Sequence, residues 1–212
     1  MERTLELMTG QQGLFVTFEG GEHTGKSTQI AALSERLRAI DRSAVTSREP
    51  GGTRLGERLR EALFEGDSPA PEAELLIFAA ARAQLVHELI RPALDRGAVV
   101  LCDRFADSTV AYQQYGRGLD PALVASVNAA TTGGLVPDLT VLLDMPPDAA
   151  RARGDEETDY IEREEAAFHD RVRDGYLALA RAEPDRWATF DAALPVETLT
   201  EQIWERLAAL LS

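Results

Sequence analysis

The sequence predicts an α/β fold in three layers, in which a five-stranded parallel sheet is flanked by helices on both faces. Two observations support this prediction. Short apolar segments alternate along the chain with longer segments whose apolar residues recur at helical spacing, and strands joined through helices run parallel. The polar clusters that could carry chemistry directly follow apolar segments, and ligands of such sheets bind beyond the carboxyl ends of the strands.

Five short apolar runs are predicted to form the strands of the sheet. They cover residues 14–18, 44–47, 98–102, 139–143 and 187–190. The third run is apolar at every position, which is typical of a strand buried on both faces.

Helices are predicted between and after these strands. The segments with helical periodicity cover residues 26–40, 55–64, 72–94, 109–115, 121–130 and 196–211. The run Pro50-Gly51-Gly52 predicts a loop after the second strand. Residues 1–12 show no clear period and are expected to form a disordered or tag-like tail, which leaves residues 13–212 as a single domain.

The composition argues against several classes of protein. Hydrophobic residues make up 44% and charged residues 27%, as in ordinary globular chains. The net charge of −14 opposes non-specific binding to nucleic acid or anionic membranes. The single cysteine, Cys102, and three histidines without metal-ligand spacing argue against disulfide, redox and zinc chemistry. No apolar run could cross a bilayer and no secretory signal is present, so a cytoplasmic protein without nucleic-acid or membrane partners is expected.

A phosphate-binding loop follows the first predicted strand. Its residues match the pattern G-x-x-x-x-G-K-[ST] and are Gly20, Gly21, Glu22, His23, Thr24, Gly25, Lys26 and Ser27, followed by Thr28. Backbone amides and a helix N-terminus would surround the phosphates, Lys26 would reach the β- and γ-oxygens, and Ser27 would ligate Mg²⁺. Lys26 is the only lysine among 22 basic residues, which disfavours the alternative of a capping turn with a surface lysine. The motif predicts a P-loop NTPase fold that binds a nucleoside triphosphate.

The phosphate loop does not specify the reaction. A GTPase is expected to carry an Asn-Lys-x-Asp guanine motif, and a chain with one lysine cannot supply it. A kinase for a small acceptor fits this length better.

The segment after the third predicted strand carries a more specific signal. Residues 103–119 read DRFADSTVAYQQYGRGL, and this stretch resembles the bacterial branch of the thymidylate kinase family. Residues 18–28, 48–56, 78–82 and 168–177 resemble the family in the same order, so the likeness spans about residues 14–195. The resemblance implies a kinase that transfers the γ-phosphoryl group of ATP to dTMP, giving dTDP and ADP in dTTP synthesis. It also implies Mg²⁺ and a homodimer.

Such an acceptor needs little acid-base chemistry. A phosphate monoester has its second pKa at about 6, so its attacking oxygen is largely deprotonated at neutral pH. Charge neutralisation and alignment remain as the catalytic tasks, and both require cations at the two phosphate groups.

The resemblance assigns residues to the acceptor. It places Arg48 and Arg104 on the acceptor phosphate, stacks Phe78 on thymine and lets Arg82 hydrogen-bond the edge of the base. Phe78 and Arg82 are four residues apart on a predicted helix and therefore share a face. Surface ion pairs for the arginines and helix packing for Phe78 are the structural alternatives. The pocket is completed by Ser108, Thr109 and Gln113.

Three further residues receive roles by resemblance. Tyr112 would crowd the 2′ position of the sugar and favour deoxyribose, and Glu22 would face the 3′-hydroxyl. Asp103 would support Mg²⁺ through water. An ordinary buried tyrosine, an acid favoured by a helix N-terminus and an aspartate paired with a neighbouring arginine are the alternatives.

A lid over the phosphates is predicted at about residues 149–164, which are polar and lack an apolar stripe. Some family members carry a catalytic arginine inside the phosphate loop and others supply it from the lid. The loop position here is His23, so the lid would provide it, with Arg153 the first candidate and Arg151 the second. A solvated, charge-balanced segment is the alternative. Adenine is expected between the base of the lid and residues 191–193.

Two positions depart from the family pattern, and two other functions compete with the kinase. Phe105 replaces the more usual Tyr or His after Asp-Arg, and Tyr160 stands where relatives often carry a lid arginine. A nucleoside kinase would use Glu22 as a base on a neutral hydroxyl. A nucleotide-sensing module without turnover is the alternative that His23 and Tyr160 favour.

Overall fold

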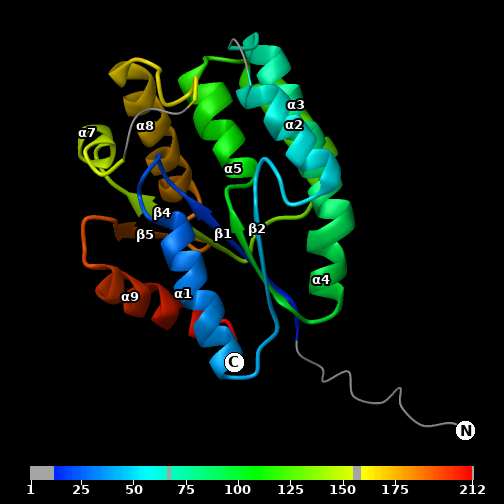
Figure 1. Cartoon of the computed structure of the whole chain (residues 1–212), viewed down its shortest axis with the longest axis vertical. Helices are drawn as coiled ribbons and strands as arrows, with labels where there is room; N and C mark the ends of the chain where they lie inside the picture. Colours follow the sequence, from blue (N-terminus) through cyan, green and yellow to red (C-terminus); the bar gives the residue numbers. More distant parts are fainter. Residues whose placement is uncertain (1–11, 66–67, 155–158, 212) are drawn as a thin grey trace, which may run out of the picture.

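Figure 1 shows the computed structural model, which describes residues 12–65, 68–154 and 159–211. The expected tail at residues 1–12 lies outside the described residues except for Gln12, whose carbonyl accepts a hydrogen bond from Arg42. Residues 155–158 of the expected lid also lie outside them. No helix among the described residues is long and apolar enough to span a membrane.

The predicted five-stranded parallel sheet is confirmed. Its strands are β1 (Leu14–Glu19), β2 (Ala44–Arg48), β3 (Val99–Asp103), β4 (Leu139–Asp144) and β5 (Trp187–Asp191), in the order β2-β3-β1-β4-β5. Every paired neighbour runs parallel. Asp103 is in register with both Phe18 and Arg48, so the polar residues that follow β1, β2 and β3 emerge at one edge of the sheet.

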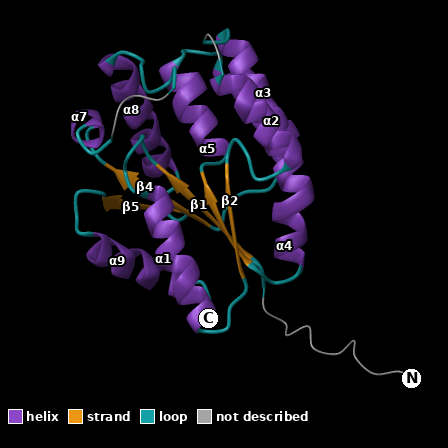
Figure 2. Ribbon diagram, in the orientation of Figure 1, coloured by secondary structure: helices purple, strands orange, loops and turns teal. Residues whose placement is uncertain are grey.

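Helices cover both faces of the sheet (Figure 2). They are α1 (Lys26–Ala39), α2 (Arg54–Phe64), α3 (Pro71–Leu85), α4 (Arg91–Asp95), α5 (Ala106–Thr109), α6 (Pro121–Thr132), α7 (Pro147–Arg151), α8 (Ala166–Ala182) and α9 (Val196–Ala208). Two π-helical segments, η1 (Val86–Ile90) and η2 (Val110–Gly116), connect α3 to α4 and extend α5. Helices α1 and α9 pack against one another on one face of the sheet (Figure 1).

Several helices differ from their predicted form. The single helix expected at residues 72–94 contains the π-helical turn η1, next to Pro92, which has no N–H for a regular backbone hydrogen bond. The segment expected as a helix at residues 109–115 begins earlier, with α5, and continues as the π-helix η2. The last helix ends at Ala208 rather than residue 211. Helix α7 begins before the expected lid and occupies its first residues, so that part of the lid is regular.

Alternate residues of β1 face two different cores. Leu14, Val16 and Phe18 pack in a cluster with α1 and α9. Phe15 packs in the opposite cluster, which includes residues of α3, η1 and β3. Because successive strand residues point to opposite faces, Glu19 lies on the same face as Phe15. The carboxylate of Glu19 is therefore buried on the Phe15 face of the sheet, directly before the phosphate loop.

Candidate active site

The phosphate loop joins β1 to α1 with a tightly turned backbone. Gly20 and Gly25 have φ of 137° and 92°, in the region that favours glycine. A Cβ on Gly20 would come within 2.5 Å of the Leu143 carbonyl oxygen. The Lys26 ammonium donates to the carbonyls of Gly20 (3.3 Å) and Gly21 (2.7 Å), so it lies across the inside of the loop. Burial and the nearby Arg104 lower the pKa of Lys26.

Oxygen ligands suited to Mg²⁺ lie next to this loop. The Ser27 hydroxyl donates to a carboxylate oxygen of Asp103 across 3.1 Å. Mg²⁺ prefers such oxygens and is usually held by one or two protein groups together with substrate phosphates. The described residues contain no cluster of three or more His, Cys, Asp or Glu that could hold a metal. The oxygens of Ser27 and Asp103 fit the expected cofactor.

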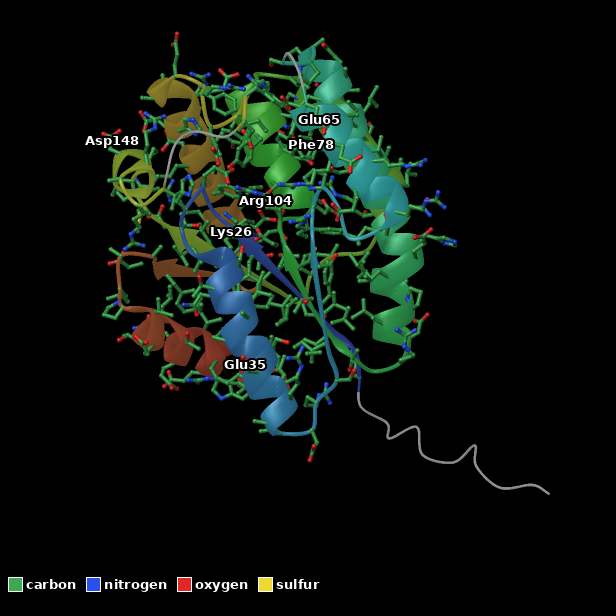
Figure 3. All side chains as sticks on the ribbon, viewed as in Figure 1. Lys26, Glu35, Glu65, Phe78, Arg104 and Asp148 are labelled. Atoms are coloured by element: carbon green, nitrogen blue, oxygen red, sulfur yellow. The ribbon has the colours of Figure 1, made fainter. Side chains whose placement is uncertain are left out.

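A cavity beside the phosphate loop gathers most of the predicted acceptor residues. Eight of them line it: Glu22, Phe78, Arg82, Arg104, Ser108, Thr109, Tyr112 and Gln113. The other lining residues are Glu49, Pro50, Arg60, Phe64, Asp159 and Ile161. Figure 3 labels Lys26 at the start of α1, Arg104 after β3 and Phe78 on α3, all at the same end of the sheet.

Arg104 links the phosphate loop to this cavity. Its backbone has φ of 68°, an unfavourable region for a non-glycine residue, and its N–H donates to the Phe18 carbonyl at 2.9 Å. Its guanidinium donates to Glu22 at 2.5 Å and to the Tyr112 hydroxyl at 3.0 Å, and it lies 4.9 Å from the centre of the Tyr112 ring. Burial raises the pKa of Glu22, but Arg104 and Lys26 outweigh it and lower the pKa to about 2.

Arg82 is buried deeper in the same cavity. Its side chain is 1% exposed and donates to Glu49 (2.8 Å) and to the Phe105 carbonyl (3.1 Å). It also donates to Asn128 and Thr109, each at 2.8 Å. Among the described residues these bonds use four of its five N–H groups, and the remaining one is on Nη1. The other carboxylate oxygen of Glu49 is buried without a hydrogen-bond partner among the described residues, and burial raises the pKa of Glu49.

Comparisons with known proteins agree with this arrangement. Residues 18–203 match the family model described as Thymidylate kinase. The thymidylate kinase of Thermomicrobium roseum is 48% identical over 200 residues, covering 93% of this chain and 95% of that protein. The thymidylate kinase of Deinococcus radiodurans is 50% identical over 201 residues, covering 91% and 95%. The crystal structure of thymidylate kinase from Ehrlichia chaffeensis matches with a TM-score of 0.76 at 34% identity, covering 92% of this chain and 99% of that one.

The chain belongs to the thymidylate kinase family. The expected family and the expected enzyme class, a nucleoside monophosphate kinase and hence a phosphotransferase, are confirmed. The P-loop α/β fold is confirmed as well.

Arg48, which the family resemblance assigns to the acceptor phosphate, lies outside the cavity that the other predicted acceptor residues line. Its side chain is 55% exposed, pairs with Glu57 at 3.1 Å and lines a groove with Ser27 and Asp103. The next residue, Glu49, points into the cavity because neighbouring residues of an extended chain face opposite sides. The acceptor cavity is thus reached by the residue after Arg48, not by Arg48 itself.

Arg60 is a cavity cation that the sequence analysis missed. It donates to the Pro50 carbonyl at 3.2 Å, and its guanidinium lies 4.9 Å from the centre of the Phe64 ring. Burial and the charge of Arg48 lower the pKa of Arg60. A signal was available, since Arg60 and Phe64 are four residues apart on a predicted helix and therefore share one face.

The lid arginines point to different places. Arg153 donates to the Ala192 carbonyl at 2.8 Å, in the loop after β5 where adenine is expected. Arg151 lines a second cavity with Gly21 and His23 of the phosphate loop and with residues of α8. The loop and lid also touch where His23 and Glu162 approach within 3.7 Å.

The two departures from the family pattern have structural roles. Phe105 is fully buried and packs edge-on against Phe15, with ring centres 4.9 Å apart. Tyr160 is 7% exposed and packs against Phe64, with ring centres 5.9 Å apart. Tyr160 and Ile161 thus pack in a buried apolar cluster near the end of the segment expected to form the lid, although its sequence lacks an apolar stripe.

Proposed function

We propose that this enzyme transfers the γ-phosphoryl group of ATP to dTMP and gives dTDP and ADP for dTTP synthesis. The observation that supports this most strongly is the position of Arg104. This residue donates to Gly20 and Glu22 of the phosphate loop and lines the acceptor cavity together with Phe78 and Arg82. Arg104 would therefore stand between the two phosphate groups, which must meet in line.

On the donor side, the phosphate loop would hold ATP. Its amides and the start of α1 would surround the β- and γ-phosphates, and Lys26 would exchange its two carbonyl partners for phosphate oxygens. Ser27 and Asp103 would hold Mg²⁺, whose charge offsets that of the triphosphate. Residues 20–28 would form this site.

On the acceptor side, Arg104 and Arg60 would bind the phosphate of dTMP. Phe78 would stack on thymine, and the remaining N–H of Arg82 would donate to a carbonyl at the edge of the base. Gln113 would bind the same edge, since Glu74 fixes its amide orientation through a 2.7 Å hydrogen bond. Ser108, Thr109, Tyr112 and Glu22 would complete the pocket, and the exposed Arg48 would contribute only after moving.

The lid would supply the transition-state cation. Arg153 lies against Ala192 and would have to swing toward the phosphates, whereas Arg151 already lines a cavity with the phosphate loop. Movement of this kind is usual for lids that close over substrates.

The exposed surface and the substrates bear on the oligomeric state and the cellular location of the enzyme. We propose a homodimer, because exposed leucines lie on three helices that pack in a row: Leu55 of α2, Leu76 of α3 and Leu123 of α6. Light scattering should then give twice the chain mass of 23.1 kDa. We propose a cytoplasmic location, since ATP and dTMP would be cytoplasmic substrates.

The test is diphosphate formation from ATP and Mg²⁺ with a panel of acceptors. The panel comprises the monophosphates of thymidine, deoxyuridine, deoxycytidine, adenosine and guanosine, and free thymidine. Preference for dTMP is expected. Turnover of free thymidine would support the nucleoside kinase instead, but the pKa of Glu22 at about 2 makes it a poor base for a hydroxyl. ATP binding without any product would support the sensing function.

A further inference from the structure

Glu19 is a buried carboxylate that the proposed function does not use. It ends β1 directly before the phosphate loop, and none of its surface is exposed. It shares a strand face with the equally buried Thr17. Burial of a carboxylate is unfavourable unless hydrogen bonds replace its hydration.

Three donors from two other parts of the chain bind Glu19. The Phe105 N–H donates to Oε1 at 2.9 Å, after the turn that follows β3. The Ser108 hydroxyl donates to Oε2 at 2.5 Å, from α5. The Tyr176 hydroxyl, from α8, donates to the same oxygen at 3.0 Å. The carboxylate therefore ties β1 to the segment that follows β3 and to α8.

The same groups hold Arg104. Its Nη1 donates to the Tyr176 hydroxyl at 3.0 Å and lies 3.4 Å from the Ser108 hydroxyl. The Phe105 N–H belongs to the peptide directly after the left-handed Arg104 backbone. Glu19 thus restrains Arg104 twice, through the peptide that follows it and through the hydroxyls that accept from its guanidinium.

The hydrogen bonds from Arg104 to Ser108 and Tyr176 depend on the charge of Glu19, because that charge sets the direction in which the two hydroxyl hydrogens point. Ser108 and Tyr176 each carry one hydrogen, and when that hydrogen points at Glu19 the oxygen lone pairs face the N–H groups of Arg104. A protonated Glu19 would itself donate to one of these hydroxyls. That hydroxyl would then turn its own hydrogen away from Glu19, and the acceptors facing Arg104 would be disturbed.

The charge of Glu19 changes near neutral pH. Burial raises its pKa to about 7 and the charge of Asp107 adds to the rise, while Ser108, Arg104 and Tyr176 oppose it. Asp107 is itself paired with Arg186 at 2.6 Å. The ionisable groups that face Glu19 are Asp107, Arg104, Tyr176, Lys26 and Cys102.

We propose that Glu19 is a positioning residue for the acceptor phosphate: its carboxylate orients Ser108 and Tyr176 so that they hold the Arg104 guanidinium toward that phosphate. This inference rests on the proposed function, because it gives Arg104 the phosphate as its ligand. Glu19 touches neither substrate, and its effect reaches the reaction through Arg104.

The first test is the Glu19→Gln variant, which keeps the shape and loses the charge. Its amide group would donate toward Ser108 and Tyr176 and reverse their hydrogens. Because hydrogen bonds to charged groups are worth about 1.5–3 kcal/mol, we expect KM for dTMP to rise about tenfold or more at pH 8. KM for ATP should change less than KM for dTMP, since Glu19 acts on Lys26 through its charge alone but binds directly the two hydroxyls that hold Arg104. An equal rise in both KM values would overturn the inference.

Two companion variants separate positioning from folding. Thr17→Val removes a buried hydroxyl, which lies 3.1 Å from that of Thr140, on the same face of β1, and should leave both KM values unchanged. Tyr176→Phe keeps Glu19 and removes one link to Arg104, so it should raise KM for dTMP selectively. If Glu19→Gln does not fold, Tyr176→Phe decides: an unchanged KM for dTMP in that variant contradicts the proposal.

The second test is the pH profile of kcat/KM for dTMP. As pH falls through about 7, Glu19 takes up a proton, so kcat/KM should decline there, above the decline from the dTMP phosphate at about pH 6. Glu19→Gln should lack the upper decline. Asp107→Asn removes the charge that adds to the raised pKa, so the upper decline should move to lower pH. A profile that is the same in all three proteins would refute the inference.

The two hypotheses fail in different ways. If the wild-type enzyme does not phosphorylate dTMP, the proposed function fails. If it does and Glu19→Gln behaves like Thr17→Val, the role of Glu19 fails while the proposed function stands.

Discussion

The acceptor side and the lid side of this site hold their cations in different ways. Arg82 and Arg104 are each fixed by several hydrogen bonds to buried partners from distant parts of the chain. On the lid side, Arg153 donates to the carbonyl of Ala192, and the contact of His23 with Glu162 spans 3.7 Å. The difference indicates that the acceptor pocket is organised before substrate binds, whereas the lid side is built to change its contacts.

The largest expected effect comes from the lysine of the phosphate loop, which lies across the inside of that loop. Lys26→Ala should lower kcat by at least about 10²–10³-fold, because it removes a cation from the site of developing phosphate charge. Arg96→Ala, an exposed cation after α4, is the matched control and should leave kcat unchanged. Phosphoryl transfer at saturating substrates is the measurement, with circular dichroism as a check of folding. A Lys26→Ala enzyme with near-normal kcat would contradict the role of the phosphate loop.

The next effect tests whether the lid acts in the transition state. Arg153→Ala should lower kcat by about 10²-fold with little change in KM, since its contact would form mainly in the transition state. Arg151→Ala is the matched comparison from the same segment. If Arg151→Ala lowers kcat and Arg153→Ala does not, the catalytic cation is the one that already lies beside the phosphate loop. If Arg153→Ala raises only KM, Arg153 is a binding residue.

A smaller effect compares two arginines at the acceptor end. Arg60→Ala should raise KM for dTMP about tenfold, as expected for a charged hydrogen bond to the phosphate. Arg48→Ala should change it less than about twofold, because an exposed pair such as Arg48 with Glu57 contributes little. Steady-state kinetics at saturating ATP provides both values. The reverse order would mean that the cavity rearranges on binding and that the family resemblance placed Arg48 correctly.

These comparisons explain what the sequence could and could not predict. The phosphate loop could be predicted from the sequence because its residues are contiguous and its function depends on backbone geometry. Most residues predicted for the acceptor came from the family resemblance, since they lie on α3, α5 and η2 rather than directly after strands. Arg48, which the resemblance assigned to the acceptor phosphate, lies outside the cavity because one step along an extended chain reverses the side on which a residue lies, so Glu49 points inward instead.

The hydrogen-bond partners of the buried carboxylates could not be predicted from the sequence. Glu19 accepts hydrogen bonds from residues 86 to 157 positions away, and Glu49 pairs with Arg82, which is 33 positions away. Such pairs form only after the sheet brings its strand ends together. The π-helical segments η1 and η2 were missed because a local widening of a helix leaves its apolar pattern nearly unchanged.

The smallest expected effect concerns the contact between loop and lid. Glu162→Gln removes the charge that His23 faces, and His23 is 34% exposed, so the pair should contribute less than about 1 kcal/mol. We expect KM for ATP to change less than about threefold and KM for dTMP not at all. His23→Gln should give the same result, since either change removes the same pair. A much larger loss in Glu162→Gln alone would show that Glu162 acts through its other contacts, and the lid would then be more firmly fixed than the comparison of the two sides indicates.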